Sequence, residues 1–494
     1  MHRGYDRNLW ATPRRMRSYK RQRLRRNVPR MEPARYDLVV LGAGPAGEKA
    51  AAQAAYWGKR VAVVDRQRRP GGTMVGGAVS SKTMREAALY LTGFQRREVY
   101  EVGLDLAPEA AVARLRHRTD DVVRLMTESA AANLHHHGVD VIHGTATLGC
   151  DRAVVVRVPD GDEPRVLQAE VIIITTGSRP FLPPGIPIDD SDILDSDAAA
   201  LLDHPLRSLV VVGGGAVGCE FASIFTALGA EVVLVDSGPR LLPFMDGEVS
   251  DLLAATFRAM GMRVLQGAGR ASAARTRAGL EVRLADGEIL RPEKVIFAAG
   301  RAGNTEGLGL DEAGVATDQR GRIVVDEQFR TTAEGIYAAG DVIGPPALAS
   351  VSMEQARVAA CWAFDIPFKR TVDPLPPFGV YSIPEVAMVG LTEEEAQSSG
   401  VAYAVGRARF DQNTRAAIAG ATEGMIKFVF DRDDLRLLGV HVIGEAATEL
   451  IHQGQTVIHF GGKIDYFIHS TFNVPTVSEA YKYAAYDGLR QVGR

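Results

Sequence analysis

The chain has 494 residues, of which 46% are apolar and 24% are charged, and its net charge is −3. This length exceeds one compact hydrophobic core, so the composition predicts an ordinary globular protein of several domains. Residues 1–30 hold eleven Lys/Arg and one acid, which leaves −13 for residues 31–494 and argues against nucleic acid as a partner.

The cysteine content and the length of the apolar runs indicate the cellular compartment and bear on membrane association. Cys150, Cys219 and Cys361 lie far apart without metal-ligand spacing, which argues against a disulfide framework and fits a reducing cytoplasm. No apolar run reaches the roughly 18–20 residues of a membrane span, so we expect no membrane association. We interpret residues 1–30 as a disordered or translated upstream segment before Met31, although their arginine-rich composition also suits a transit peptide or a basic tail.

A nucleotide-binding pattern opens the main body of the chain. An apolar strand is expected over 36–41, then the sequence GAGPAG, an Ala-rich helix over 48–57, and a strand over 61–64 that closes on Asp65. In such a unit the three glycines, Gly42, Gly44 and Gly47, permit a tight turn, close approach to a pyrophosphate, and helix packing. The complete strand–loop–helix–strand–acid order therefore predicts a dinucleotide site with a ribose-binding acid.

The same pattern returns about 170 residues later. A strand over 209–212 precedes GGGAVG, a helix over 219–228 follows, and a strand over 231–235 closes on Asp236. Its glycines are Gly213, Gly215 and Gly218. Two complete units predict two bound dinucleotides, one in each of two domains.

The remaining segments complete the predicted organisation. A long helix over 107–137 ends in three consecutive histidines, which we interpret as a surface turn because adjacent helical residues point in different directions. After a proline-rich linker near 372, alternating strands and helices predict an α+β domain. We expect an α/β protein with two Rossmann-like domains and a C-terminal α+β dimerisation domain. The expected divisions are a head over 1–30, an FAD-binding domain over 31–186 and 305–371, an NAD(P)-binding domain over 187–304, and an interface domain over 372–494.

The ordered motifs carry a family resemblance. GAGPAG, the GG…SK helix, TTGSRP, GGGAVGCE, AAGR, IYAAGD and PTVSE follow one another as in the flavoprotein disulfide reductases that include dihydrolipoamide dehydrogenase and glutathione reductase. The resemblance covers nearly all of 31–489. Three stretches, at 80–93, 444–455 and 472–489, are closer to the soluble pyridine nucleotide transhydrogenases.

This resemblance implies FAD in the first unit and NAD(H) or NADP(H) in the second. It implies that Lys82 lies beside the flavin, paired with Glu220, where an ammonium would stabilise the anionic reduced ring. The implied FAD residues are Gly42, Gly44, Gly47, Asp65, Gly72, Thr73, Lys82, Gly177, Gly340 and Asp341. The implied NAD(P) residues are Gly213, Gly215, Gly218, Asp236, Arg240 and Gly300.

The departures from the disulfide reductases decide the expected chemistry. Their GGTCxNxGCxPSK loop has two redox cysteines, which fall here on Thr73 or Met74 and on Ala78. The histidine that a partner subunit supplies before PTxSE is Val474 here. Thiol chemistry needs a thiolate, so the disulfide relay and its proton shuttle are absent together.

Hydride transfer between two nicotinamide nucleotides through a flavin requires proximity and orientation and no protein acid or base. We therefore expect an FAD-dependent transhydrogenase working as a homodimer. Asp236 favours NAD, while Arg240 is either a 2′-phosphate ligand or a solvated loop residue. The alternatives are a thiol-independent NAD(P)H oxidase or diaphorase that reduces oxygen or quinones, and a flavin-binding redox-sensing subunit of low turnover.

Overall fold

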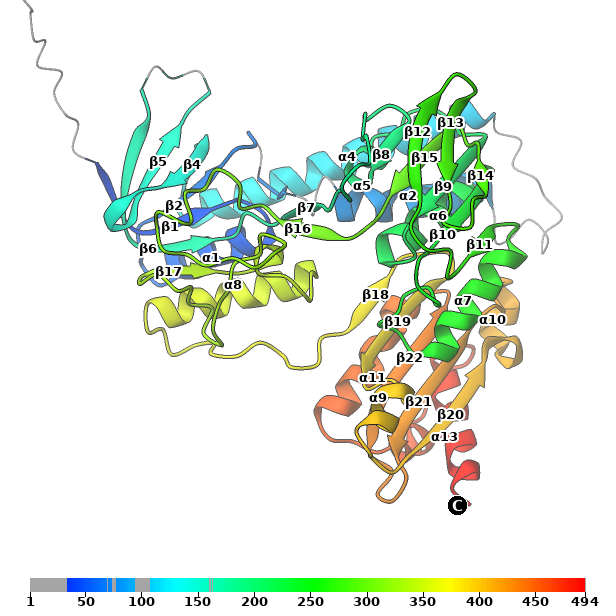
Figure 1. Ribbon diagram of the computed structural model, residues 1–494. Helices are drawn as coiled ribbons and strands as arrows, with labels where there is room; N and C mark the ends of the chain where they lie inside the picture. The colour runs from blue at the N-terminus through cyan, green and yellow to red at the C-terminus, as the bar shows by residue number, and fades with distance from the viewer. Residues whose placement is uncertain are drawn as a thin grey trace, which may run out of the picture.

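The computed structural model describes residues 33–493 except 69, 73–76, 94–106, 160 and 162. These residues form two lobes (Figure 1). One lobe is a first α/β domain, and the other holds a second α/β domain above the C-terminal domain. The basic head, Thr73 and Met74 lie outside the described residues.

The first α/β domain is built on a sheet in the order β3-β2-β1-β6-β5-β4, with β17 paired to β6. Strand β1 lies between two parallel neighbours, so Val39 pairs with Ala62 on one side and Ile172 on the other. Its residues 38–41 are buried on both faces, as expected for a central parallel strand. The strands are β1 Ala34–Leu41, β2 Val61–Asp65, β3 Asp140–His143, β4 Thr145–Leu148, β5 Ala153–Arg157, β6 Arg165–Ile174 and β17 Ile336–Ala338.

Helices α1 (Pro45–Tyr56) and α8 (Ala349–Ala363) pack together against this sheet. Two further helices, α2 (Val79–Thr92) and α4 (Pro108–His136), pack on each other and reach toward the second lobe (Figure 1). Helix α2 also contacts α6 of the second α/β domain. The helix that carries Lys82 therefore lies where the two α/β domains meet.

The second α/β domain repeats the parallel core, with strand order β11-β10-β9-β15-β8. A separate antiparallel sheet of β12, β13 and β14 packs beside it, and β16 pairs with β7 as a two-stranded link between the domains. The elements are β7 Ser178–Pro180, β8 Ile193–Asp195, α5 Ser196–Ala199, β9 Ser208–Val212, α6 Ala216–Ala227, β10 Glu231–Val235, α7 Gly247–Ala259, β11 Arg263–Leu265, β12 Ser272–Thr276, β13 Gly279–Arg283, β14 Ile289–Leu290, β15 Lys294–Phe297 and β16 Arg301–Gly303.

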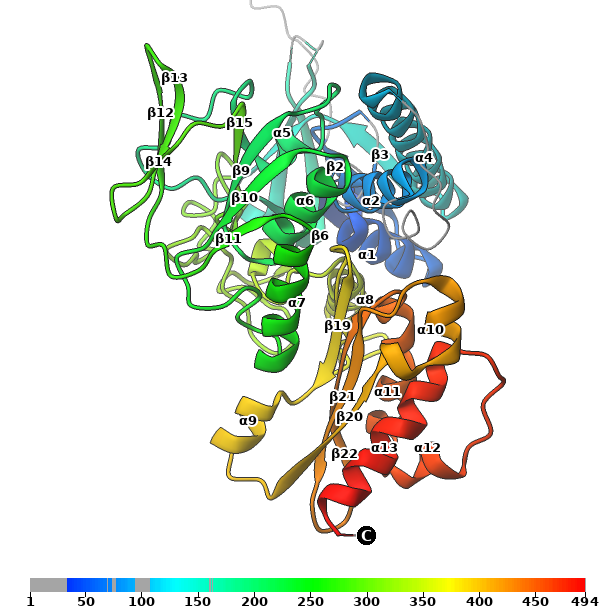
Figure 2. The ribbon, with the colours of Figure 1, turned by 90° about the vertical axis from the view of Figure 1, so that its right-hand side faces the viewer.

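The C-terminal domain is an antiparallel sheet in the order β18-β19-β22-β21-β20, with helices packed on it (Figure 2). Phe428, Phe467 and Tyr481 pack together in its core. Its elements are β18 Phe378–Val380, β19 Glu385–Gly390, α9 Glu393–Ser398, β20 Tyr403–Arg409, α10 Thr414–Ala419, β21 Met425–Asp431, β22 Leu437–Gly444, α11 Ala447–His459, α12 Asp465–His469 and α13 Ala480–Gln491.

The predicted starts of the two helices that follow the glycine loops were wrong by three residues, and the loops explain why. Helix α1 begins at Pro45 because proline suits the first helical position, where its missing N–H would have no partner. Helix α6 begins at Ala216, directly after the N-cap Gly215. Both phosphate loops are therefore shorter than the sequence predicted, and the first helical turn begins inside each glycine motif.

Candidate functional site

The first glycine loop leaves no room for side chains. Gly42 has φ +104°, and a Cβ there would lie 2.5 Å from the carbonyl oxygen of Thr175. A Cβ on Gly47 would lie 1.8 Å from the Gly42 oxygen. Gly44 caps α1 without a side-chain hydrogen bond, so the first N–H groups of that helix have no side-chain cap. Uncapped N–H groups at a helix N-terminus are suited to bind an anion such as a pyrophosphate.

Asp65 ends β2 beside this loop. Its carboxylate accepts hydrogen bonds from the backbone N–H of Ala43 at 2.5 Å and of Gln67 at 2.7 Å. The acid therefore holds the loop and the end of the strand together. It also lines the cavity described next, where an oxygen could accept from a ribose hydroxyl.

A cavity of about 710 Å³ runs from this loop to the meeting point of all three domains. It brings together most of the residues that the sequence implied for FAD. Those that line it are Gly42, Gly44, Asp65, Gly72, Lys82, Gly177 and Asp341, together with Glu220. Gly47 and Gly340 are not among its lining residues, and Thr73 lies outside the described residues.

Lys82 and Glu220 form an ion pair at one end of the cavity. Lys82 Nζ lies 2.7 and 2.8 Å from the two carboxylate oxygens of Glu220. The Glu220 side chain is only 7% exposed, and its carboxylate also accepts from the backbone N–H of Tyr381 at 3.0 Å and from Ser81 Oγ at 3.3 Å. Because three donors hold the carboxylate, the ammonium has a fixed position facing the cavity. The pair expected from the sequence is thus present, with α2 and α6 each supplying one partner.

Asp341 follows β17 at the opposite wall. Its carboxylate accepts hydrogen bonds from Ser178 Oγ at 3.0 Å and Ser352 Oγ at 3.1 Å. Gly340, directly before it, has φ +81° and its N–H donates to Gln355 Oε1. A left-handed backbone turn thus presents the acid to the cavity.

The second glycine loop is built like the first. Gly213 has φ +120° and a Cβ there would lie 2.4 Å from the Ala298 oxygen. Asp236 accepts from the backbone N–H of Gly214 and of Gly238, both at 2.9 Å. A Cβ on Gly218 would lie 1.8 Å from the Gly213 oxygen. The loop and its acid are therefore in the arrangement that binds a second dinucleotide.

Arg240, which the sequence offered as a 2′-phosphate ligand, is paired with two acidic side chains. Its guanidinium lies 3.1 Å from Glu394 Oε1 and 3.3 Å from Asp251 Oδ1, over the start of α7. A 2′-phosphate at Arg240 would have to compete with these two carboxylates.

Gly300, the last of the residues implied for NAD(P), has φ +103°, and its carbonyl oxygen accepts a hydrogen bond from the N–H of Phe181.

No cysteine is among the described residues that line this cavity. Ala78, where one cysteine would stand, is the N-cap of α2 and lines the cavity. Cys219 is buried, and burial together with Asp236 and Glu220 raises the pKa of its thiol far above the ordinary value. Burial also raises the pKa of Cys361. Val474, in place of the histidine, is 68% exposed on the C-terminal domain.

Sequence analysis missed the part of the wall that the C-terminal domain supplies. Tyr381, Thr448, His452 and Gln455 all line the cavity. The ring of Tyr381 lies beneath Lys82, with Nζ 5.0 Å from its centroid. Tyr381 lies about 300 positions after Lys82 in the chain, and the other three lie about 370 positions after it. Thr448, His452 and Gln455 belong to the stretch 444–455 that resembles the transhydrogenases, and that resemblance was the signal that could have indicated them.

A second groove adjoins the cavity between α2 and α4. It encloses about 700 Å³ and shares Ala78, Lys82 and Tyr381 with the first cavity. Val79, Ala87 and Leu91 give it an apolar wall. The groove therefore reaches Lys82 past Ala78, one of the two positions where a disulfide reductase has a cysteine.

Among the described residues, no group of three or more His, Cys, Asp or Glu side chains could hold a metal ion. Of the three consecutive histidines, His135 and His136 lie in the last turn of α4, and His137 is its C-cap. No helix within the described ranges combines the length and apolarity that crossing a membrane requires.

Comparisons with known proteins agree with this geometry. Residues 36–358 match the pyridine nucleotide-disulphide oxidoreductase model, and residues 376–485 match the dimerisation domain of the same family. A soluble pyridine nucleotide transhydrogenase of Mycobacterium tuberculosis is 42% identical over 458 residues, covering 92% of this chain and 98% of the relative. One from Marinomonas is 38% identical over 465 residues, covering 92% and 99%.

Solved structures give the same result. LpdA from Mycobacterium tuberculosis superposes with a TM-score of 0.82 at 28% identity, covering 92% of this chain and 99% of that one. The HOCl-induced flavoprotein disulfide reductase RclA from Escherichia coli gives a TM-score of 0.81 at 26% identity, covering 91% and 99%.

Proposed function

Because this chain belongs to the pyridine nucleotide-disulphide oxidoreductase family, we propose that it is an FAD-dependent enzyme that transfers hydride between NADPH and NAD. The relatives named soluble pyridine nucleotide transhydrogenases support this activity. One observation carries the proposal. The Lys82–Glu220 pair is intact at the cavity, while Ala78 and Val474 stand where a disulfide reductase needs a thiol and an imidazole.

The first α/β domain fits FAD. Its glycine loop, the uncapped start of α1 and the adjoining 710 Å³ cavity suit a pyrophosphate followed by a large planar group. We assign the FAD contacts to Gly42, Gly44, Gly47, Asp65, Gly72, Thr73, Lys82, Gly177, Gly340 and Asp341. When bound, FAD supplies a ring that takes up hydride from one nucleotide and gives it to another.

The protein residues have binding and electrostatic roles in this proposal. Lys82 holds a positive charge at the cavity, and Glu220 fixes the position of that charge. An ammonium placed in advance stabilises negative charge that develops next to it, without reorganisation during the reaction. In this proposal no residue would need to donate or remove a proton, because hydride transfer between bound FAD and a bound nucleotide would require from the protein only proximity and orientation.

The second α/β domain is the proposed site for NAD(H) and NADP(H). We assign its contacts to Gly213, Gly215, Gly218, Asp236, Arg240 and Gly300. Asp236 is placed to bind a free ribose 2′-hydroxyl, which favours NAD. The pairing of Arg240 with Glu394 and Asp251 weakens the case for this arginine as the 2′-phosphate ligand.

We propose a homodimer formed through the C-terminal domain. The match to a dimerisation domain supports this, as do large apolar side chains exposed there, including Phe460 at 80% and Val474 at 68%. We also place the enzyme in the cytoplasm, because its relatives are named soluble. Light scattering of the purified chain tests the dimer, and a monomer would contradict it.

Stopped-flow spectroscopy of the flavin tests the activity. The holoenzyme is first reduced with NADPH and then mixed in separate experiments with NAD, oxygen and a quinone. Rapid reoxidation by NAD, with slow reaction toward the other two, is the expected result. Reoxidation by oxygen or quinone alone would overturn the transhydrogenase proposal, and lipoamide turnover would overturn the thiol argument.

The groove between α2 and α4 favours a second candidate function, reduction of a quinone or a similar flat acceptor. Such a molecule fits an apolar groove of about 700 Å³ that ends at Lys82. The quinone arm of the same experiment tests it, with Ala87→Trp filling the groove. Fast quinone reduction that this substitution abolishes, while transfer to NAD continues, would establish the second activity.

A further inference from the structure

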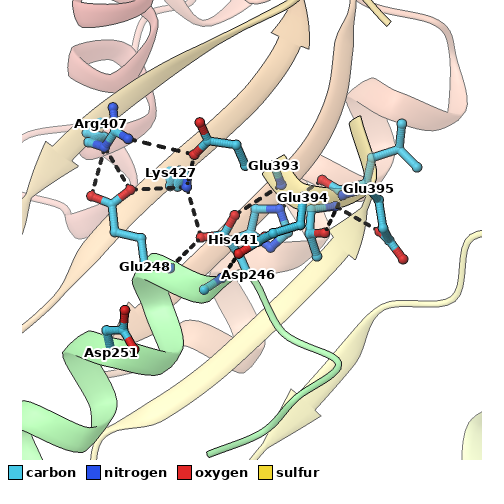
Figure 3. Close-up of polar contacts among 12 residues, drawn as sticks. Asp246, Glu248, Asp251, Glu393, Glu394, Glu395, Arg407, Lys427 and His441 are labelled. Carbon is cyan, nitrogen blue, oxygen red and sulfur yellow. Dashed lines mark hydrogen bonds and ion pairs between the residues drawn. The ribbon is translucent and has the colours of Figure 1, made fainter. Parts of the chain in front are cut away.

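The second α/β domain is joined to the C-terminal domain by a group of charged residues with a buried centre, shown in Figure 3. We call it the junction cluster and define it by five residues: Asp246, Glu248, Glu393, Arg407 and Lys427. Asp246 and Glu248 lie at the N-terminus of α7, in the second α/β domain. The other three belong to α9, β20 and β21 of the C-terminal domain.

Lys427 is the centre of the junction cluster. Its Nζ lies 2.6 Å from Glu393, 2.9 Å from Asp246 and 3.1 Å from Glu248, so three carboxylates from two domains contact one ammonium. Arg407 adds a second cation, with Nε 2.8 and 2.9 Å from the two oxygens of Glu248. The bonds drawn in Figure 3 thus cross the domain boundary several times.

Burial makes these contacts strong constraints. The side chain of Lys427 is 1% exposed and that of Asp246 is fully buried. Burial by itself lowers the pKa of Lys427, but Glu393 and Asp246 outweigh it and hold the pKa above the ordinary value. An unpaired charge at such a position is very unfavourable, so separating the domains here would require water to enter or the pair to be lost.

A second contact fixes the same two domains near the reaction site. The backbone N–H groups of Tyr381 and Ile383 donate to Glu220 at 3.0 Å and to Ser223 Oγ at 3.1 Å. Glu220 is the residue that holds Lys82. Helix α6 is therefore tied to the loop between β18 and β19 of the C-terminal sheet, while the start of α7 is tied to β20 and β21 at the other side of that sheet.

Two separated points of attachment prevent a rotation that one point would allow. We propose that Lys427 is a positioning residue, which fixes the second α/β domain against the C-terminal domain so that a nicotinamide bound there meets the flavin. The inference rests on the proposed hydride transfer. Its physical basis is that the adenosine end of the nucleotide binds wholly within the second α/β domain. The reacting end must reach a cavity whose other walls belong to the two remaining domains.

The test compares two buried lysines in the holoenzyme. Lys427→Met removes the ammonium that joins the domains. Lys294→Met is the matched control, because Lys294 is also a buried lysine with an acidic partner, yet its contacts with Ser191 and Asp192 stay inside the second α/β domain. Glu248→Gln is a milder variant of the junction cluster, because the Glu248 side chain is 38% exposed and the glutamine that replaces it can still form hydrogen bonds.

Two measurements separate misplacement from simple loss of stability. One is the limiting rate of flavin reduction at saturating NADPH, taken from the folded, flavin-containing fraction. The other is the binding of 5′-AMP by calorimetry, which requires only the second α/β domain. In Lys427→Met we expect the limiting rate to fall about tenfold to a hundredfold, with 5′-AMP affinity unchanged, because small misplacements of reacting groups have effects of this size. Glu248→Gln should show a smaller fall in the same direction, and Lys294→Met none.

Three results would overturn the inference or the function on which it rests. A wild-type limiting rate in the folded fraction of Lys427→Met or of Glu248→Gln would overturn the inference. An equal fall in rate in Lys294→Met would also overturn it, since the effect would then be general destabilisation. If Lys427→Met fails to fold, the milder Glu248→Gln carries the test. Failure of NADPH to reduce the wild-type flavin would instead overturn the proposed function itself.

Discussion

The two glycine loops of this chain share one local structure and differ in their surroundings. In each, the first loop N–H donates to the end of the second strand, Gly42 to Val64 and Gly213 to Val235, both at 2.8 Å. In each, the closing acid accepts from the backbone of the next loop residue. The repeated sequence pattern thus gives a repeated hydrogen-bonding pattern.

The two glycine loops differ in how they lie relative to the cavity at the meeting point of the domains. The first loop and its acid line a cavity of about 710 Å³. Of the second unit, that cavity is lined only by Ala216, Val217, Glu220 and Phe221 on α6, while its glycine loop and Asp236 are not among the lining residues. The first loop therefore shares a cavity with the Lys82–Glu220 pair, whereas the second presents only its helix to that cavity. This difference fits the proposed resident cofactor at the first loop and the proposed exchanging nucleotide at the second.

The sharpest way to break this comparison is to add one methyl group to each loop. A Cβ on Gly47 or Gly218 would lie 1.8 Å from a backbone oxygen. Overpacking of this kind lowers the free energy of unfolding by about 1–3 kcal/mol. We expect Gly47→Ala to lose its flavin during purification. Gly218→Ala should keep the flavin and bind NAD(P)H roughly 10- to 100-fold more weakly. Visible absorbance and calorimetry provide the two readouts.

Gly215→Ala is the control for that pair, because a Cβ there meets no protein atom within 4 Å. Its melting temperature should equal that of the wild type. Loss of flavin from Gly218→Ala would contradict the assignment of one ligand to each loop.

Removing the charge at the meeting point of the domains should have the next largest effect. Lys82→Ala should slow flavin reduction about 100-fold while FAD stays bound, because a preplaced charge-stabilising group contributes a factor of this order. Lys49→Ala is a suitable comparison, since Lys49 also pairs with a glutamate but lies on α1. An unchanged rate in Lys82→Ala would show that the ammonium does not act on the flavin.

Nucleotide preference sharpens the description of the second loop. Arg240 is held by Glu394 and Asp251, so we expect Arg240→Ala to weaken NADPH binding less than tenfold. Asp236→Asn should weaken NADH more than NADPH, because only NADH has a free 2′-hydroxyl for the acid to bind. Titration of each variant with both nucleotides measures the ratio. A large, NADPH-specific loss in Arg240→Ala would restore the 2′-phosphate role that the sequence suggested.

The smallest expected effect is a pH dependence of stability at the contact between the second α/β domain and the C-terminal domain. His441 lies beside the junction cluster on β22, and its Nε2 donates to the carbonyl oxygen of Leu391 at 2.9 Å. Burial lowers its pKa, although Asp246 opposes this, and Lys427 also lowers it. Because the folded pKa is below the unfolded value, the stabilisation is present above about pH 6.5 and is lost as pH falls.

Denaturant melts between pH 7 and pH 5 test this, with His441→Gln as the comparison. The substitution should reduce the fall in unfolding free energy over that range, since glutamine does not titrate and its amide can still donate to Leu391. The pKa of Asp246 is also lowered: burial would raise it, but His441 and Lys427 outweigh burial. Its contribution is lost only at more acidic pH. Identical pH dependence in both proteins would contradict the assignment to His441.

Local sequence was sufficient for both nucleotide units because their geometry depends on neighbours in the chain. The glycines, the helix that follows and the closing acid lie within about 25 residues, and backbone sterics leave few alternatives at those positions. The pair of Lys82 and Glu220 came from a family resemblance, and the structure confirms that the two side chains meet. The absence of the redox cysteine pair is a property of the sequence alone.

Only the tertiary structure decided which loop lines the cavity and what surrounds Lys82. Tyr381 and Thr448 reach the cavity because the loop between β18 and β19 is hydrogen-bonded to α2 and α6, and no sequence pattern encodes that contact. The junction cluster shows the same limit. Lys427 is an ordinary polar position in a predicted strand, and its burial among three carboxylates depends on a domain that lies 180 residues earlier. Chain-local hydrogen bonds can be predicted from spacing, whereas charges that meet across domains depend on how those domains pack.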